Sequence, residues 1–297
     1  MIRPFRILHA ALALALLPAI APAGSPLFGY AAIACDHDDP FDKQSKTDYS
    51  DEVTGFTTAN QVCVTGDMDI LAHRLRRAAA AYTPVFYVEP VFFDHSRPVP
   101  RLHPSVNTLW AMVRQAIRKS GVDPRDMIFY LADEPVLRGL PVATVDQAAR
   151  IIRRHYPGAR ILVIEAYLPD KLAIPDEADI WGFNAYTIRD PRADKGYVRL
   201  LDRAAALLGP NRSLAIIMDA QHTPIHEKAG LRPADMAEVA WNYMALTQSR
   251  NDVALMLGYT WAGGIDNRRE RGVRDLPDAV RQAHRQIGQT LRERPRP

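Results

Sequence analysis

The sequence has few cysteines, little net charge and no glycine-rich nucleotide motif. Only two cysteines occur in 297 residues, which excludes a small scaffold held by several disulfides. The formal net charge is +3, and part of it lies in two arginines near the start, so we expect no nucleic acid as partner. Because no phosphate loop or dinucleotide fingerprint follows any strand-like run, we expect no nucleotide, and the sequence implies no other cofactor.

A long apolar run is present only at the beginning of the chain. Two arginines precede an apolar stretch over 10–21, and Ala-Pro-Ala at 21–23 fits a small-x-small cleavage site. These features predict a signal peptide over 1–23 and a mature protein that is periplasmic or secreted. The run is too short for a membrane-spanning helix, so we expect no stable membrane insertion after cleavage. An uncleaved anchor is the alternative.

Residues 24–297 have the composition of one globular domain, in which short apolar runs alternate with amphipathic helices. This alternation is typical of parallel βα units, and eight strands is the number that closes a (β/α)8 barrel. We expect helices over 67–81, 106–120, 145–155, 195–208, 233–249 and 276–292, with at most one turn near 169–174. The expected strands are 30–35, 61–64, 85–91, 127–132, 160–166, 180–185, 214–218 and 253–259.

The first βα unit is predicted to be irregular, because the polar stretch over 36–55 shows no clear helix. The alternative architecture is an open doubly wound sheet, which would normally carry a glycine-rich phosphate loop after its first strand. Cys35 is followed instead by Asp-His-Asp-Asp-Pro. Cys35 and Cys63 fall in neighbouring predicted strands, so they form either a disulfide or two buried thiols.

Polar and aromatic side chains follow the predicted strands, at the end where (β/α)8 barrels carry their active sites. Together they predict an acidic, aromatic-lined pocket there. The candidates, in chain order, are Asp36, Glu89, Asp133, Glu134, Glu165, Asn184, Tyr186, Asp219, Gln221, Tyr259 and Trp261.

Paired carboxylates among aromatic rings suit glycoside hydrolysis. One carboxyl group protonates the leaving oxygen while a second acts on the other side of the sugar, about 5 Å away for retention and about 6.5–9.5 Å for inversion. Aromatic rings give the sugar an apolar face to stack on, and burial among them raises the pKa of the acid.

The sequence Asp133-Glu134-Pro135 resembles the Asn-Glu-Pro that ends strand 4 in the large clan of (β/α)8 retaining glycoside hydrolases. The resemblance implies that Glu134 is the acid/base. It also implies that Tyr186 and Trp261 line the pocket, as the clan's tyrosine and tryptophan do. The clan's nucleophile is a glutamate that ends strand 7, where this chain has Asp219. Asp133 in place of asparagine is a second departure from the clan.

We therefore predict Glu134 and Asp219 as the catalytic pair and the other candidates as substrate-binding residues. Because Asp133 and Glu134 are adjacent, we expect only one to point along the barrel axis, with Asp133 as the substitute acid. Glu165 is the alternative second carboxylate. The competing interpretation makes these groups loop carboxylates and barrel-top packing residues.

Three functions remain open at this point. The first is an exported glycoside hydrolase acting on a carbohydrate, and the second is a barrel that binds a saccharide or another ligand without cleaving it. Aspartate in place of glutamate after strand 7 keeps the second function open. The third is a metal-dependent deacetylase, suggested by Asp-His-Asp-Asp at 36–39. No His-x-x-x-His motif accompanies it, so we expect no catalytic metal.

Overall fold

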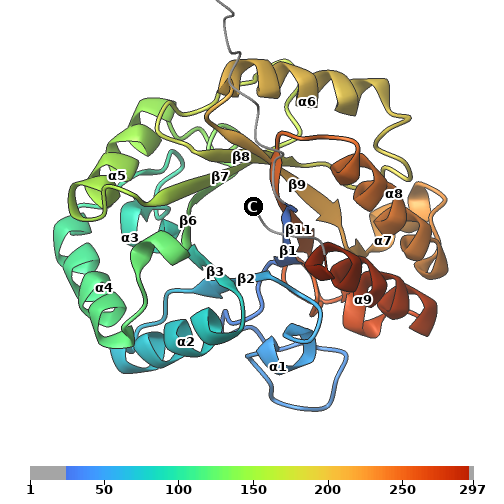
Figure 1. The fold of residues 1–297 in the computed structure, drawn as a ribbon, viewed down its shortest axis with the longest axis horizontal. Helices are drawn as coiled ribbons and strands as arrows, with labels where there is room; N and C mark the ends of the chain where they lie inside the picture. Colours follow the sequence, from blue (N-terminus) through green and yellow to red (C-terminus); the bar gives the residue numbers. More distant parts are fainter. Residues whose placement is uncertain (1–24, 294–297) are drawn as a thin grey trace, which may run out of the picture.

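The computed structural model describes residues 25–293, so the predicted signal peptide lies outside the described residues. Eight parallel strands form one sheet in the order β1-β11-β9-β8-β7-β6-β3-β2, and Figure 1 shows them around a central axis with the helices outside. The (β/α)8 barrel predicted from the sequence is confirmed. Its strands are β1 (Leu27–Tyr30), β2 (Ala59–Cys63), β3 (Thr83–Tyr87), β6 (Ile128–Asp133), β7 (Arg160–Ala166), β8 (Ile180–Asn184), β9 (Ser213–Asp219) and β11 (Val253–Tyr259).

The barrel closes between β1 and β2, where side chains replace part of the backbone ladder. The Thr58 hydroxyl and the Asn60 amide oxygen accept hydrogen bonds from the backbone N–H groups of Phe28 and Tyr30, at 2.8 and 3.1 Å. The strands approach so closely that a Cβ at Gly29 would lie 1.3 Å from the carbonyl oxygen of Ala59. Only glycine fits at this contact.

The helices cover the outside of the barrel, and their apolar faces pack on the outward side chains of the strands. A second, smaller core of branched side chains, such as Val85, Leu162 and Leu255, fills the barrel interior. The larger helices are α2 (Met68–Ala81), α4 (Val106–Ser120), α5 (Val142–His155), α6 (Lys195–Leu208), α8 (Met236–Gln248) and α9 (Asp278–Glu293). In the part of the chain that the structure describes, no helix is long and apolar enough to cross a membrane.

Short elements decorate the loops. They are α1 (Ser50–Val53), α3 (Glu89–Phe92), α7 (Pro224–Lys228), the 3-10 turns η1 (Pro124–Asp126), η2 (Pro233–Asp235) and η3 (Val273–Asp275), and the strands β4 (Phe93–Asp94), β5 (Arg101–Leu102), β10 (Gln221–His222) and β12 (Arg271–Gly272). β10 pairs antiparallel with β12, which ties the loop after β9 to the loop after β11.

The structure corrects the sequence prediction at several boundaries. The first strand is Leu27–Tyr30 rather than 30–35, because the chain turns at Ala32 and Asp36, where φ is 55° and 56°. Helix α5 begins at Val142, three residues earlier than expected, with Pro141 as its N-cap. Within the described chain, β7 and β8 are joined without a helix, whereas the irregular first unit contains only the single turn of α1. Helices α4 and α6 have the predicted bounds.

Candidate active site

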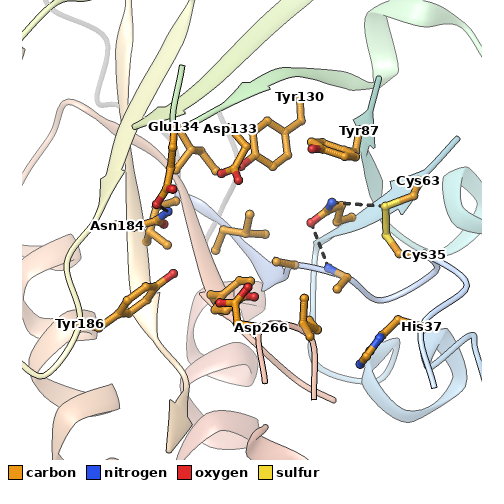
Figure 2. Close-up of a pocket in the computed structure, with 18 of the residues that line it drawn as sticks. Cys35, His37, Cys63, Tyr87, Tyr130, Asp133, Glu134, Asn184, Tyr186 and Asp266 are labelled. Carbon is orange, nitrogen blue, oxygen red and sulfur yellow. Dashed lines mark hydrogen bonds between the residues drawn. A yellow bond between two sulfur atoms is a disulfide. The ribbon is translucent and has the colours of Figure 1, made fainter. Parts of the chain in front are cut away.

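A cavity of about 380 Å³ opens at the carboxyl ends of the barrel strands (Figure 2). Strand-end residues such as Cys63, Tyr87 and Asn184 line it, and branched side chains of the barrel interior lie beneath it. Its polar and aromatic lining consists of His37, Gln61, Tyr87, Tyr130, Asp133, Glu134, Arg138, Asn184, Tyr186, Tyr259 and Asp266. Five of these, Asp133, Glu134, Asn184, Tyr186 and Tyr259, were predicted from the sequence.

Asp133 and Glu134 both line the cavity, contrary to the expectation that only one of them would. The reason lies in the backbone. The pairing of β6 with β7 shifts register between Tyr130 and Ala132, and Glu134 adopts a left-handed conformation with a φ of 50°. Two adjacent side chains that would alternate on a regular strand therefore face the same space.

Asp133 is held by a tyrosine and an arginine. The Tyr130 hydroxyl donates to one carboxylate oxygen at 2.6 Å, and the Arg138 guanidinium donates to the other at 2.9 Å. Burial raises the pKa of Asp133 to about 6, and these two hydrogen bonds only partly offset that effect. Asp133 can therefore hold a proton in mildly acidic solution.

Glu134 contacts Asn184, a second residue predicted from the sequence. The Asn184 amide donates to Glu134 Oε1 at 3.1 Å (Figure 2). The backbone N–H of Glu134 donates to the carbonyl of Ile164 at 2.7 Å, which anchors the residue to β7. Among the described residues Glu134 Oε2 has no hydrogen-bond partner, so one oxygen remains available to a ligand.

The facing wall of the cavity carries two tyrosines and a third carboxylate. The rings of Tyr186 and Tyr259 lie 5.8 Å apart, and Figure 2 shows Asp266 across the cavity from Asp133. Asp266 belongs to the loop after β11, and its backbone N–H donates to the side chain of Glu270 at 2.7 Å. Glu270 is buried, and burial raises its pKa to about 7.

Asp219 ends β9 as predicted, but its side chain is fully buried and does not line the cavity. One of its oxygens accepts from the backbone N–H of Thr187 at 2.8 Å. His226 Nε2 lies 3.1 and 2.9 Å from the two oxygens, while its Nδ1 accepts from the backbone N–H of Thr223. Because Nδ1 accepts a hydrogen bond, the ring proton is on Nε2, and this N–H group donates a hydrogen bond to Asp219.

Glu89 and Glu165 are buried carboxylates that support the end of β6 rather than line the cavity. Glu165 accepts from the backbone N–H groups of Val136 and Leu137 at 2.8 and 3.3 Å. Glu89 accepts from the backbone N–H of Asp133 at 3.1 Å. Burial raises the pKa of both carboxyl groups. Both were predicted as substrate-binding residues, and the structure places them behind Asp133 and Glu134, where they accept from the backbone of this segment.

Three other predicted residues lie away from the cavity. Asp36 is bound to Arg74 of α2. Trp261 is 1% exposed, and its indole N–H donates to Glu52 at 2.7 Å, so the expected aromatic wall does not include it. Its ring packs between Tyr30 and Phe56, outside the strands. Gln221 lies beside a neighbouring depression.

Six polar or aromatic cavity residues were not among the predicted site residues: His37, Gln61, Tyr87, Tyr130, Arg138 and Asp266. The two tyrosines lie inside strand runs at inward-facing positions, and the period of two from Ile128 to Tyr130 could have identified the second. Arg138 and Asp266 lie in irregular loops, where the sequence carries no signal of direction. Within residues 25–293 no group of three or more His, Cys, Asp or Glu side chains could hold a metal ion.

Cys35 and Cys63 form a disulfide, the first of the two alternatives, with their Cα atoms 4.7 Å apart. Both residues line the cavity (Figure 2). The bond joins the turn after β1 to the end of β2, close to the point where the barrel closes.

No protein-family model matches the sequence, and no curated protein does. Solved structures do match. A GH113 β-1,4-mannanase is 14% identical with a TM-score of 0.56, covering 92% of this chain and 100% of its own. Xylanase 10B from Thermotoga petrophila, in complex with xylobiose, is 12% identical with a TM-score of 0.53, covering 90% and 94%.

Active domain 2 of a Pyrococcus furiosus chitinase, complexed with chito-oligosaccharides, is 11% identical with a TM-score of 0.53, covering 92% of this chain and 98% of that one. The protein thus has the (β/α)8 fold found in these glycoside hydrolases. Since barrels of this fold also serve unrelated chemistries, the likeness establishes the fold, and the function has to be argued from the site.

Proposed function

We propose that the protein is a glycoside hydrolase whose substrate lies in the cavity at the carboxyl end of the barrel. The observation that carries this proposal is the placement of the cavity carboxylates. Asp133 and Glu134 lie on one wall, Asp266 lies across from them, and tyrosines line the space between. Glycosidic bond cleavage needs such an opposed arrangement, because one group acts on the leaving oxygen and another on the sugar ring.

Glu134 is the proposed general acid. Its Oε1 is fixed by Asn184, so the side chain is oriented while Oε2 faces the ligand space. Asp133 lies beside it with a pKa raised to about 6. The wall therefore has a second carboxyl group that can hold a proton in mild acid.

Asp266 is the proposed second carboxylate. It is the carboxylate that the structure gives to the facing wall, where Tyr186 and Tyr259 supply an apolar surface for a sugar ring. Asp219, the residue predicted for this role, has no exposed atom through which a substrate could touch it. Asp266 can stabilise positive charge on the ring or activate a water, and the stereochemistry of the product distinguishes these roles.

The second candidate function is a saccharide-binding barrel without turnover. The burial of Asp219 favours it, because the position that resembles the clan's nucleophile is occupied by a structural hydrogen-bonding group. In that case the tyrosines, Asn184 and Glu134 would bind sugar hydroxyls without cleaving the bond.

We further propose that the protein is exported to the periplasm or beyond. The charged and apolar pattern over 1–23 supports this, and so does the Cys35–Cys63 disulfide, since disulfides persist in oxidising compartments. N-terminal sequencing of protein recovered from a bacterial periplasm tests it. A mature chain that still begins at Met1 would contradict the proposal.

Incubation with aryl glycosides and with polysaccharides, including mannan, xylan and chitin, tests the proposed hydrolysis. Release of reducing ends is expected from at least one substrate, and proton NMR of the first product gives retention or inversion. Binding of a saccharide in calorimetry without any release of reducing ends would reject the hydrolase and support the binding barrel.

A further inference from the structure

A second depression, of about 490 Å³, adjoins the cavity. Helix α7 and the loop after β11 form its sides. Tyr186 and Asp266 line both spaces, and Figure 2 shows these two residues at the edge of the cavity. A ligand longer than one sugar ring can therefore extend from the cavity past these residues into the depression.

The depression is rich in cations that have no internal partner. Lys228, Arg268 and Arg269 line it, and all three residues are exposed. Among residues 25–293, no carboxylate forms a salt bridge with any of them, whereas exposed arginines such as Arg189 and Arg192 are paired. The lining contains one carboxylate, Asp266, against these three cations. Its field therefore favours an anion.

A buried amide oxygen at the same place also lacks a partner. Gln221 is 3% exposed and lines the depression, and within the described chain its Oε1 forms no hydrogen bond. Buried polar groups in native proteins are almost always paired, so an unpaired oxygen beside an open space indicates a missing ligand or solvent contact. Ile225, 52% exposed at this depression, offers an apolar contact to a ring.

The charges of the two spaces are opposite. The cavity has three carboxylates, Asp133, Glu134 and Asp266, against the single guanidinium of Arg138. An anionic sugar unit would be repelled from the cavity and attracted to the depression. The charge pattern therefore sets the direction in which a saccharide with anionic units lies across the site.

We propose that the depression is a subsite for an anionic sugar unit, one that carries a carboxylate or a sulfate, in a saccharide whose next unit occupies the cavity. This inference rests on the proposed function, because it names the substrate class of the same site. Arg268 and Arg269 would pair with the anionic group, and Gln221 Oε1 would accept a hydrogen bond from a neighbouring sugar hydroxyl. Guanidinium groups suit both anions, since their paired N–H groups match two oxygens at once.

Calorimetry with the full mature chain tests the subsite without requiring turnover. The probes are oligomers of galacturonate, of mannuronate and of sulfated galactose, each with a neutral partner made by carboxyl reduction or desulfation. We expect at least one anionic oligomer to bind more tightly than its neutral partner. The difference in affinity between the anionic oligomer and its neutral partner should become smaller as salt is added, because the cations are exposed and salt screens them.

The matched variants are R268Q/R269Q and R118Q/R154Q. Arg118 and Arg154 are exposed arginines at the ends of α4 and α5, and like the first pair they form no salt bridge within the described chain. R268Q/R269Q should weaken binding of the anionic oligomer by about 5- to 25-fold, the loss expected for two partly exposed charges. R118Q/R154Q should leave the affinity unchanged.

The inference is overturned if no anionic oligomer binds, if neutral partners bind equally well, or if R268Q/R269Q binds as the native chain does. These failures differ from failure of the proposed hydrolase. Anion binding that depends on the two arginines, without cleavage of any glycoside, would retain the subsite and reject the hydrolase. Suppose instead that neutral glycosides are cleaved, that R268Q/R269Q leaves the KM unchanged, and that anionic oligomers bind no more tightly than neutral ones. That result would retain the hydrolase and reject the subsite.

Discussion

The carboxyl ends of β6 and β9 hold carboxylates in two different settings. At β6, Asp133 and Glu134 face the cavity, and the buried Glu89 and Glu165 brace the turn behind them. At β9, Asp219 is fully buried and is held by His226 of α7 and by the backbone N–H of Thr187. The loop after the strand therefore decides whether a carboxylate at a strand end is available to a ligand.

The difference has a local cause in each loop. After β6, the left-handed conformation of Glu134 places its side chain beside that of Asp133 at the cavity. After β9, Thr223 caps α7 and brings the His226 ring back onto Asp219. The arrangement after β6 leaves carboxylates accessible to a ligand. The arrangement after β9 surrounds the carboxylate of Asp219 with hydrogen-bond donors of the protein.

Loss of the proposed acid should produce the largest effect at this pair of strand ends. Glu134→Gln keeps the side-chain shape but removes the proton, so kcat should fall by about 10²–10⁴-fold on substrates with poor leaving groups. Substrates whose leaving group needs no protonation should lose much less. Steady-state kinetics on a matched pair of alkyl and nitrophenyl glycosides measures both. Equal activity of the variant on every substrate would remove Glu134 from the mechanism.

Asp266→Asn and Asp219→Asn compare the exposed and buried candidates for the second carboxylate directly. If Asp266 acts on the sugar ring, Asp266→Asn should lower kcat by about 10²-fold or more on both kinds of substrate, with little change in stability. The opposite ranking of the two variants in kcat would restore Asp219 as the catalytic partner.

Asp219→Asn should act mainly on stability. The amide places an N–H group against the two donors that now point at the carboxylate, from Thr187 and His226, so one donor loses its acceptor. The free energy of unfolding should fall by about 1–3 kcal/mol. Urea denaturation measures it, with Asp266→Asn as the surface control.

A smaller effect is expected where β6 is braced. Glu165→Gln keeps the size of the side chain but leaves one oxygen to serve the backbone N–H groups of Val136 and Leu137. We expect a loss of about 1–2 kcal/mol in the free energy of unfolding and a fall in kcat of about tenfold or less. A fall in kcat as large as that of Glu134→Gln would instead make Glu165 the second catalytic carboxylate, the alternative that the sequence left open.

The sequence predicted the barrel well because strand and helix periods are local properties. Helices α4 and α6 have their predicted bounds, and the carboxylates at 133 and 134 lie at the predicted end of the barrel. Which strand-end side chains reach the cavity depends on long-range contacts. Trp261 lies away from the cavity and donates a hydrogen bond to Glu52, a residue far from it in the sequence. No local sequence pattern indicates that contact.

The same limit explains the residues that were missed. Asp266 reaches the cavity because β12 pairs with β10 and because Glu270 holds the intervening loop from within. Arg138 reaches it because the turn after β6 is fixed by Glu165. Both depend on contacts between loops of different strands, which a single sequence does not specify.

The smallest effect concerns pH and the proton of Asp133. Burial raises the pKa of this carboxyl group to about 6, so folding favours its protonated form. Its contribution to stability is therefore fully present below the pKa of an unfolded aspartate, near 4, and is lost as pH rises through about 6.

Asp133→Asn does not titrate, so its stability relative to the native chain should improve by about 1–2 kcal/mol between pH 4 and pH 7.5. Urea denaturation of both chains across this range gives the difference. A difference that stays constant with pH would mean that the pKa of Asp133 is not raised, and that this carboxylate is already negatively charged in mild acid.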